Sequence, residues 1–180
     1  MERAEIRLDI PSMTGAFDVG DAVVHPHHGA GVVISRGPRR LLGTTRHYLE
    51  IELALHSLTI MVPCDCASRV GLRAVMDRQR FRQILEVLEQ EPEVASENWS
   101  ARQKRLRAKL QDGDVLELAA VLAELAARAA KSPPPATERA LYARSRQILA
   151  SELRYILDVN EAGAEAYIDE HVAGEPLSLA

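Results

Sequence analysis

The sequence predicts an α+β protein in which a small antiparallel β module precedes a compact all-α domain. Between residues 16 and 70, apolar and polar residues alternate in short segments that are separated by Gly, Pro and Asp. This pattern is typical of half-buried strands. After residue 71, apolar residues recur every three or four positions, as on one face of an amphipathic helix. The 180 residues, 47% apolar and 4% aromatic, suit one or two domains with small aliphatic cores.

The β module is predicted from four strand-like segments, residues 17–25, 29–36, 47–53 and 57–63. Their short, even spacing favours a small antiparallel barrel or a curled sheet. Gly37-Pro38 and Leu42-Gly43 mark the turn region of a long hairpin, and residues 56–57 mark a tighter turn. The tip of the long hairpin is basic and carries Arg36, Arg39, Arg40 and Arg46.

Five helices are predicted in the second half, at about residues 77–90, 99–112, 115–129, 137–158 and 161–171. Ser96 or Asn98 is a suitable N-cap for the second helix and Asp114 for the third, because their side chains accept hydrogen bonds from free backbone N–H groups. The proline run at 133–135 ends the third helix and leads into the fourth.

These patterns divide the chain into four parts. They are a flexible extension at 1–15, the β module at 16–70, the helical domain at 71–173 and a tail at 174–180. No apolar run is long enough to span a bilayer, and the start lacks the order of a signal peptide. We therefore expect a cytoplasmic protein with no membrane partner, whose two cysteines, Cys64 and Cys66, are reduced.

Glu152 interrupts the apolar stripe of the fourth predicted helix. A buried carboxylate destabilises the fold unless a partner satisfies it. We predict that Glu152 is buried and is held by a hydrogen bond or ion pair to another helix, in a structural role.

Positive charge is concentrated in one block, although the formal net charge is −4. Residues 99–131 carry seven basic and four acidic residues, and the run WSARQKRLRAKL at 99–110 carries five Lys or Arg with no acidic residue. An acidic total disfavours indiscriminate binding to long DNA. The block at 99–131 indicates a small, directed DNA contact that another partner holds in place.

Enzyme and metal signatures are weak. His25, His27 and His28 with Cys64 and Cys66 match none of the common zinc spacings. No nucleophile elbow, phosphate-binding loop or dinucleotide fingerprint occurs in the sequence. We expect no catalytic residue, no metal and no cofactor.

Trp99, the single tryptophan, has two interpretations. It shares a helix face with Leu106 and Leu110, which favours a place in the core. It also lies in the first turn of its helix beside a block of cations, and minor-groove proteins insert apolar side chains between base steps while cations hold the phosphates. The first interpretation fits a protein-only adaptor, and the second fits a DNA-contacting regulator.

Several segments in combination resemble the CarD/CdnL family of bacterial transcription regulators. They are FDVGDAVVHPHHGAGVV, the pair HYLEIEL and LTIMVP, NWS followed by basic residues, and ARSRQILASEL. The resemblance covers about residues 17–172, and the order and distances of the motifs make it specific. The first segment alone also resembles the polymerase-interacting module of transcription-repair coupling factors.

The resemblance implies an SH3- or Tudor-like β module that binds the RNA polymerase β subunit. It also implies a helical domain that contacts promoter DNA in the minor groove with little sequence specificity, and so stabilises the open complex. Trp99 matches the residue that acts as a wedge at the upstream edge of the bubble, and Arg102 and Lys104 match residues that contact phosphates. Arg105 and Lys109 complete the expected DNA-binding set.

For the polymerase contact, the resemblance points to the hairpin tip and to one strand of the β module. The expected residues are Arg39, Arg40, Ile60, Met61, Val62 and Pro63. Some family members carry Arg where this chain has Met61, so we expect a more apolar and less salt-dependent contact here. The helical stripes need no second copy for their burial, and a monomer is expected.

Overall fold

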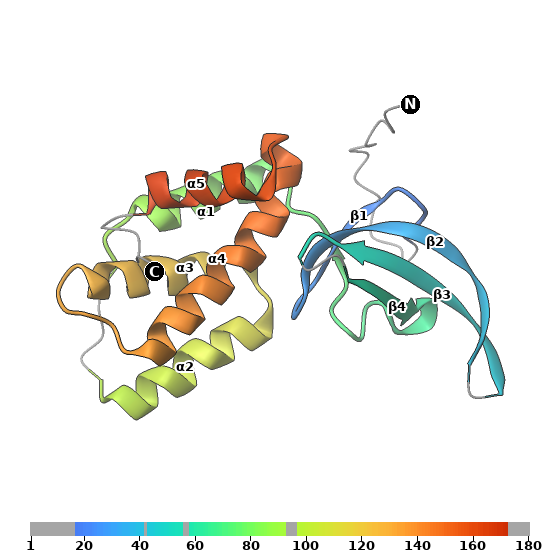
Figure 1. The fold of residues 1–180 in the computed structure, drawn as a ribbon, viewed down its shortest axis with the longest axis horizontal. Helices are drawn as coiled ribbons and strands as arrows, with labels where there is room; N and C mark the ends of the chain where they lie inside the picture. Colours follow the sequence, from blue (N-terminus) through green and yellow to red (C-terminus); the bar gives the residue numbers. More distant parts are fainter. Residues whose placement is uncertain (1–16, 42, 56–57, 93–96, 173–180) are drawn as a thin grey trace. The chain divides into compact units, whose positions relative to one another are not determined.

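The computed structural model describes residues 17–41, 43–55, 58–92 and 97–172. The predicted extension at 1–15 and tail at 174–180 lie outside these ranges. The chain folds as two compact units, residues 1–75 and 76–180. The first is a β sheet and the second is a helical bundle (Figure 1). Among the described helices, none is long and apolar enough to cross a membrane.

Unit 1 is an antiparallel five-stranded sheet with the strand order β4-β3-β2-β1-β5. The strands are β1 (Ala22–His25), β2 (Gly29–Leu41), β3 (Thr44–Leu53), β4 (Thr59–Pro63) and β5 (Arg73–Ala74). A short 3-10 helix, Cys64–Cys66, follows β4. The strand pattern that the sequence predicted is confirmed, and this sheet is the β part of an α+β fold.

Alternating side chains bring the apolar residues of the strands to one face of the sheet. Its buried core contains Val23, Val33, Leu49, Ile51, Leu53, Val62, Ala67 and Leu72. Gly31 permits the close approach of β2 and β3, because a Cβ atom at this position would lie 2.4 Å from the backbone oxygen of Glu52. The curvature that packs this face follows in part from a register shift between Val33 and Ser35.

The long hairpin of β2 and β3 differs from the prediction in one detail. Gly37 and Pro38 lie within β2, paired with Tyr48 and His47, and the strands continue to the pair Leu41 and Thr44. Of the second predicted turn signal, Leu42 lies outside the described residues and Gly43 lies in a turn, so the strands are longer than predicted. The sheet also extends beyond residue 70, because β5 pairs with β1.

Unit 2 consists of α1 (Arg78–Glu89), α2 (Trp99–Asp112), α3 (Val115–Ala129), α4 (Ala136–Leu157) and α5 (Glu161–His171). The side chains of Asp77, Asn98, Asp114 and Asn160 cap four of these helices by accepting backbone N–H groups. Helix α3 is the most apolar, and it packs against α1, α2 and α4, while α5 packs against α4 and α1 (Figure 1). The five predicted helices are present.

Glu152 is 1% exposed within this bundle, as predicted. Its carboxylate oxygen Oε1 accepts the backbone N–H of Met76 at 2.6 Å. This partner lies just before α1 rather than in another helix. The carboxylate therefore fixes the segment that enters the helical unit.

Candidate functional site

Helix α2 begins at Trp99 because the preceding residue caps it. The Asn98 side chain accepts the backbone N–H of Ala101 at 2.8 Å, which satisfies one of the free donors of the first turn. Ser96, the other predicted cap, lies outside the described residues. The helix ends at Gly113, whose φ of 75° suits glycine.

Trp99 is 52% exposed. Helical spacing alone favours burial, whereas the wedge role that the resemblance implies predicts a side chain that is at least partly exposed, and this prediction is confirmed. Leu106 and Leu110 on the same face are 0% and 8% exposed. The difference arises because Trp99 occupies the first turn, where a side chain lies at the limit of the bundle. A large aromatic ring that is half exposed at a helix end is available to a partner.

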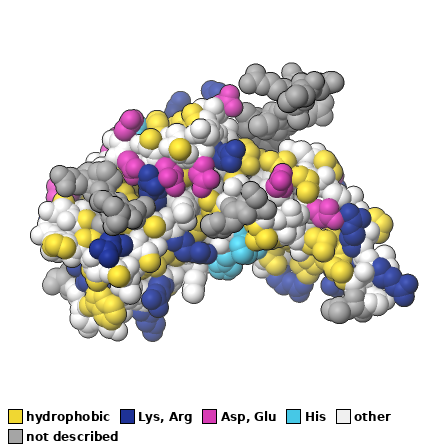
Figure 2. Space-filling view, viewed as in Figure 1, with side chains coloured by type: hydrophobic (Ala, Val, Ile, Leu, Met, Phe, Trp, Pro, Cys, Tyr) yellow, Lys and Arg dark blue, Asp and Glu magenta, His cyan; other side chains and the backbone are white. Residues whose placement is uncertain are grey.

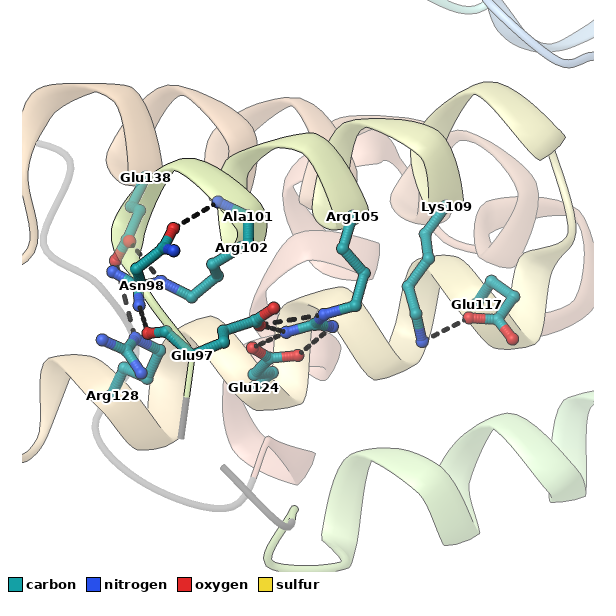
Figure 3. A network of polar contacts seen from close by, with 10 residues as sticks. All are labelled: Glu97, Asn98, Ala101, Arg102, Arg105, Lys109, Glu117, Glu124, Arg128 and Glu138. Atoms are coloured by element: carbon teal, nitrogen blue, oxygen red, sulfur yellow. Dashed lines mark hydrogen bonds and ion pairs between the residues drawn. The ribbon is translucent and has the colours of Figure 1, made fainter. Parts of the chain in front are cut away.

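Arg102, one turn after Trp99, is buried, and its charge is paired within the bundle. Its Nε donates to Oε1 of Glu138 at 2.9 Å, and the two side chains are 9% and 2% exposed. Glu138 lies in the first turn of α4, and Nε of Arg128 is 3.8 Å from its second oxygen. Figure 3 shows these three residues together. The pair is a buried connection between α2 and α4.

Arg105 is held between two carboxylates (Figure 3). Its Nη1 and Nη2 donate to the two oxygens of Glu124 on α3, at 2.9 and 2.7 Å, which is a bidentate geometry. Its Nε donates to Glu97 at 2.9 Å, and Nη2 also contacts this carboxylate. Hydrogen bonds to Glu124 and then to Glu97 raise the pKa of Arg105 above its ordinary value. Arg105 thus joins Glu97, two residues before α2, to α3.

Lys109, near the end of α2, is the third paired cation. Its Nζ lies 2.6 Å from Oε2 of Glu117 on α3, and the two side chains are 30% and 43% exposed. This pair is closer to solvent than the Arg102 pair, and we assign it a correspondingly smaller stabilising effect.

Lys104 and Arg107 lie on the exposed side of α2. Their separation of three residues makes them neighbours on a helix surface. Within the described ranges, neither forms an ion pair. Figure 2 shows Lys and Arg side chains beside hydrophobic ones over this part of the helical unit.

The structure therefore divides the block of cations on α2 that the sequence predicts to contact DNA. Arg102, Arg105 and Lys109 are each paired with carboxylates of their own unit, because α2 packs beside the acidic residues of α3 and α4. Their contact with DNA stays a prediction that no contact in the structure supports. Arg107, which is not in the expected DNA-binding set, is exposed next to Lys104. Its spacing of three residues from Lys104 is the sequence feature that predicts this shared outer face.

The predicted polymerase-binding residues of unit 1 divide in a similar way. Met61 is 45% exposed on β4, which is a terminal strand of the sheet, whereas Val62 is 5% exposed in the core. Ile60 and Pro63 are partly buried. Since side chains alternate along a strand, the Val62 side chain faces the core, and its contact with polymerase stays a prediction.

The two predicted arginines of the hairpin, Arg39 and Arg40, differ in their contacts. Arg39 is on the long hairpin, and its Nε and Nη2 donate to Oε1 of Glu50 at 2.9 and 2.6 Å. Glu50 is paired across the strands with Met61. Arg39 therefore lies over the same outer face as Met61. Arg40 is exposed farther along β2.

The histidines gather at the turn between β1 and β2. The ring centroids of His25 and His28 are 4.8 Å apart, and burial, followed by the charges of His28 and His27, lowers the pKa of His25. Cys64 and Cys66 are free thiols. Among the described residues, no group of three or more potential ligands is placed to hold a metal ion.

Two family models match the two units. Residues 17–76 match the CarD-like/TRCF RID domain, and residues 83–169 match the C-terminal domain of CarD. The chain belongs to the CarD family. The N-terminal match of this CarD-family chain is to a domain type that interacts with RNA polymerase.

One relative of this CarD-family protein is "Putative transcription factor YdeB" of Bacillus subtilis (strain 168). The two are 24% identical over 151 residues, which are 84% of this chain and 99% of the relative. The match thus extends through both units, and the chain is a regulator of the CarD type.

Proposed function

We propose that this chain binds the β subunit of RNA polymerase through unit 1 and stabilises the promoter open complex with Trp99. In this proposal, the ring enters the minor groove at the upstream edge of the bubble and opposes its closure. The observation that carries the proposal is the 52% exposure of Trp99 at the first turn of a helix with free cations.

A wedge acts on the energy of closing the bubble rather than on base identity. Separating a stacked step costs a few kcal/mol, so a ring lodged there shifts the open population by about one or two powers of ten. No base edge need be read, and little sequence preference is expected. This mechanism requires an exposed apolar ring, and Trp99 supplies it.

Lys104 and Arg107 are the residues that we assign to the phosphate backbone. Both are exposed on the outer side of α2 and are available for phosphates without breaking an ion pair. Arg105 and Lys109 would have to exchange Glu124 or Glu117 for a phosphate, and Arg102 would have to leave the bundle interior. These three cations are therefore less available to phosphates than Lys104 and Arg107.

The polymerase contact is assigned to the outer face of β4 and the hairpin. Met61 and Arg39 lie on this face, with Ile60, Pro63 and Arg40 at its margins. A chain with a net charge of −4 has little nonspecific attraction to DNA. Attachment to polymerase supplies a high local concentration at the promoter, so that a small DNA contact suffices.

The test is the lifetime of open complexes formed with polymerase and the full chain. Trp99→Ala should keep its affinity for polymerase while the lifetime falls by about one or two powers of ten toward the value without the protein. Equal lifetimes for the variant and the wild type would overturn the wedge and leave the adaptor interpretation.

Met61→Arg tests the polymerase surface separately. A cation in place of the thioether should make polymerase binding more dependent on ionic strength, because a charge contact is screened and an apolar one is not. Binding to immobilised β subunit at several salt concentrations measures this change. A Lys104→Ala control, on the other unit, should bind like the wild type.

A further inference from the structure

The two residues before α2, Glu97 and Asn98, are tied to the first two turns of the helix. Asn98 caps the helix, and the backbone oxygen of Glu97 accepts Nη1 of Arg102 at 3.5 Å. The Glu97 side chain contacts Arg105, which lies two turns into α2. Residues just before Trp99 are thus hydrogen-bonded to residues just after it.

The same two arginines connect this turn to the rest of the bundle. Arg105 joins Glu97 to Glu124 on α3, and Arg102 joins the turn to Glu138 on α4 (Figure 3). Helix ends ordinarily fray, since their last turns have few tertiary contacts. Here Arg102 in the first turn of α2 has a carboxylate partner on α4, and Arg105 one turn later links Glu97 to a carboxylate on α3.

Trp99 has an exposed fraction of 52%, so burial alone does not immobilise its side chain. Its direction depends on the backbone of the turn to which it belongs. Ordering a side chain on binding costs free energy, and a group that is ordered beforehand avoids this cost. The contacts of Arg102 and Arg105 hold the backbone of this turn in place and so limit the orientations of Trp99 before DNA binds.

We propose that Glu97, Glu124 and Glu138 are positioning residues that, through Arg105 and Arg102, hold the first turn of α2 and present Trp99 in a fixed orientation. The expected effect on open complexes rests on the proposed wedge function of Trp99. It assigns two of the paired cations of α2, Arg102 and Arg105, to orientation, whereas the free cations Lys104 and Arg107 contact DNA.

The first test measures the motion of Trp99 without DNA. Because Trp99 is the single tryptophan, time-resolved fluorescence anisotropy of the full chain reports on this side chain directly. Glu97→Gln should increase the amplitude of the fast depolarisation, since a neutral amide holds a guanidinium less strongly. Glu117→Gln is the matched control, because it removes a carboxylate partner at the other end of the same helix.

A second variant preserves the charge and guards against a general loss of folding. Arg105→Lys keeps one positive charge but lacks the planar fork that contacts two carboxylates. It should show the same increase in fast depolarisation, with a circular dichroism spectrum like that of the wild type. The proposal is overturned if Trp99 is as ordered in Glu97→Gln and Arg105→Lys as in Glu117→Gln.

The second test measures open-complex lifetimes with polymerase. Glu97→Gln should shorten the lifetime by about two- to tenfold, which corresponds to the ordering cost of one side chain. In the Trp99→Ala background the same substitution should have no further effect, because its action passes through the ring.

The two proposals fail in distinguishable ways. If Trp99→Ala leaves the lifetime unchanged, the wedge function is wrong, whatever the anisotropy shows. If Trp99→Ala shortens the lifetime but Glu97→Gln shortens it equally in both backgrounds, the positioning role is wrong and the wedge remains.

Discussion

Helix α2 carries basic residues on both its inner and its outer side, but those on the inner side are paired with carboxylates and those on the outer side are exposed. On the inner side, Arg102 lies against Glu138 with only 9% of its side chain exposed. On the outer side, Lys104 and Arg107 are exposed without an ion pair among the described residues. The comparison shows that positive charge in a sequence block has two uses, and only its surroundings distinguish them.

The difference follows from the cost of burying charge. A guanidinium that leaves water must find carboxylates, and once matched it contributes to the fold rather than to attraction of phosphates. A solvated cation remains available and releases counterions when it meets DNA. The first set should therefore be detected by stability measurements and the second by salt dependence.

The largest expected effect is on the inner side. Glu138→Ala should reduce the free energy of unfolding of the helical unit by about 3–5 kcal/mol, because Arg102 would stay buried without its partner. Denaturant unfolding followed by Trp99 emission measures this loss. Lys104→Ala, on the outer side, should change stability by no more than about 0.5 kcal/mol. If Glu138→Ala and Lys104→Ala lost similar amounts of unfolding free energy, the distinction between the inner and outer sides of α2 would be wrong.

The salt dependence of DNA binding probes the outer side. With a short forked DNA and the full chain, Lys104→Ala and Arg107→Ala should each lower the slope of log K against log salt by about 0.7–0.9. Lys109→Ala should leave the slope nearly unchanged, because Glu117 already neutralises that charge. An equal decrease for Lys109→Ala would mean that this ion pair opens to DNA.

The smallest effect is a pH dependence on the inner side. The hydrogen bond from Arg105 lowers the pKa of Glu97 below its ordinary value of 4.5. Its stabilising contribution is therefore fully present above pH 4.5 and is lost as the pH falls through the lowered pKa. The stability difference between the wild type and Glu97→Gln should shrink over this interval. A difference that is constant with pH would contradict the assigned pairing.

Local patterns were sufficient to predict the elements of the fold. Alternation around Leu49 and Ile51 identified the strands, and Asn98 and Asp114 marked the starts of two helices because capping acts over a few residues. The two-residue strand β5 was missed, since so short a segment has no period. Gly37-Pro38 predicts a turn because these residue types favour turns, but both residues lie within β2.

The site was less predictable because its contacts join distant residues. The sequence placed Trp99 and the cations on one helix, and it favoured burial of Trp99 by spacing alone. It contained no signal that Glu138, 36 positions after Arg102, would meet that side chain. Partners brought together by packing become visible only in the folded chain, and they decided which of the five cations are free.

The most direct measurement of the central proposal places a fluorescent base at the upstream edge of the bubble. With 2-aminopurine substituted at successive positions of a promoter, wild-type protein should change the emission in open complexes at the edge step, because the Trp99 ring contacts the neighbouring base. Trp99→Ala, bound to polymerase to the same extent, should leave that emission as it is without the protein. An identical change with both proteins would contradict the wedge.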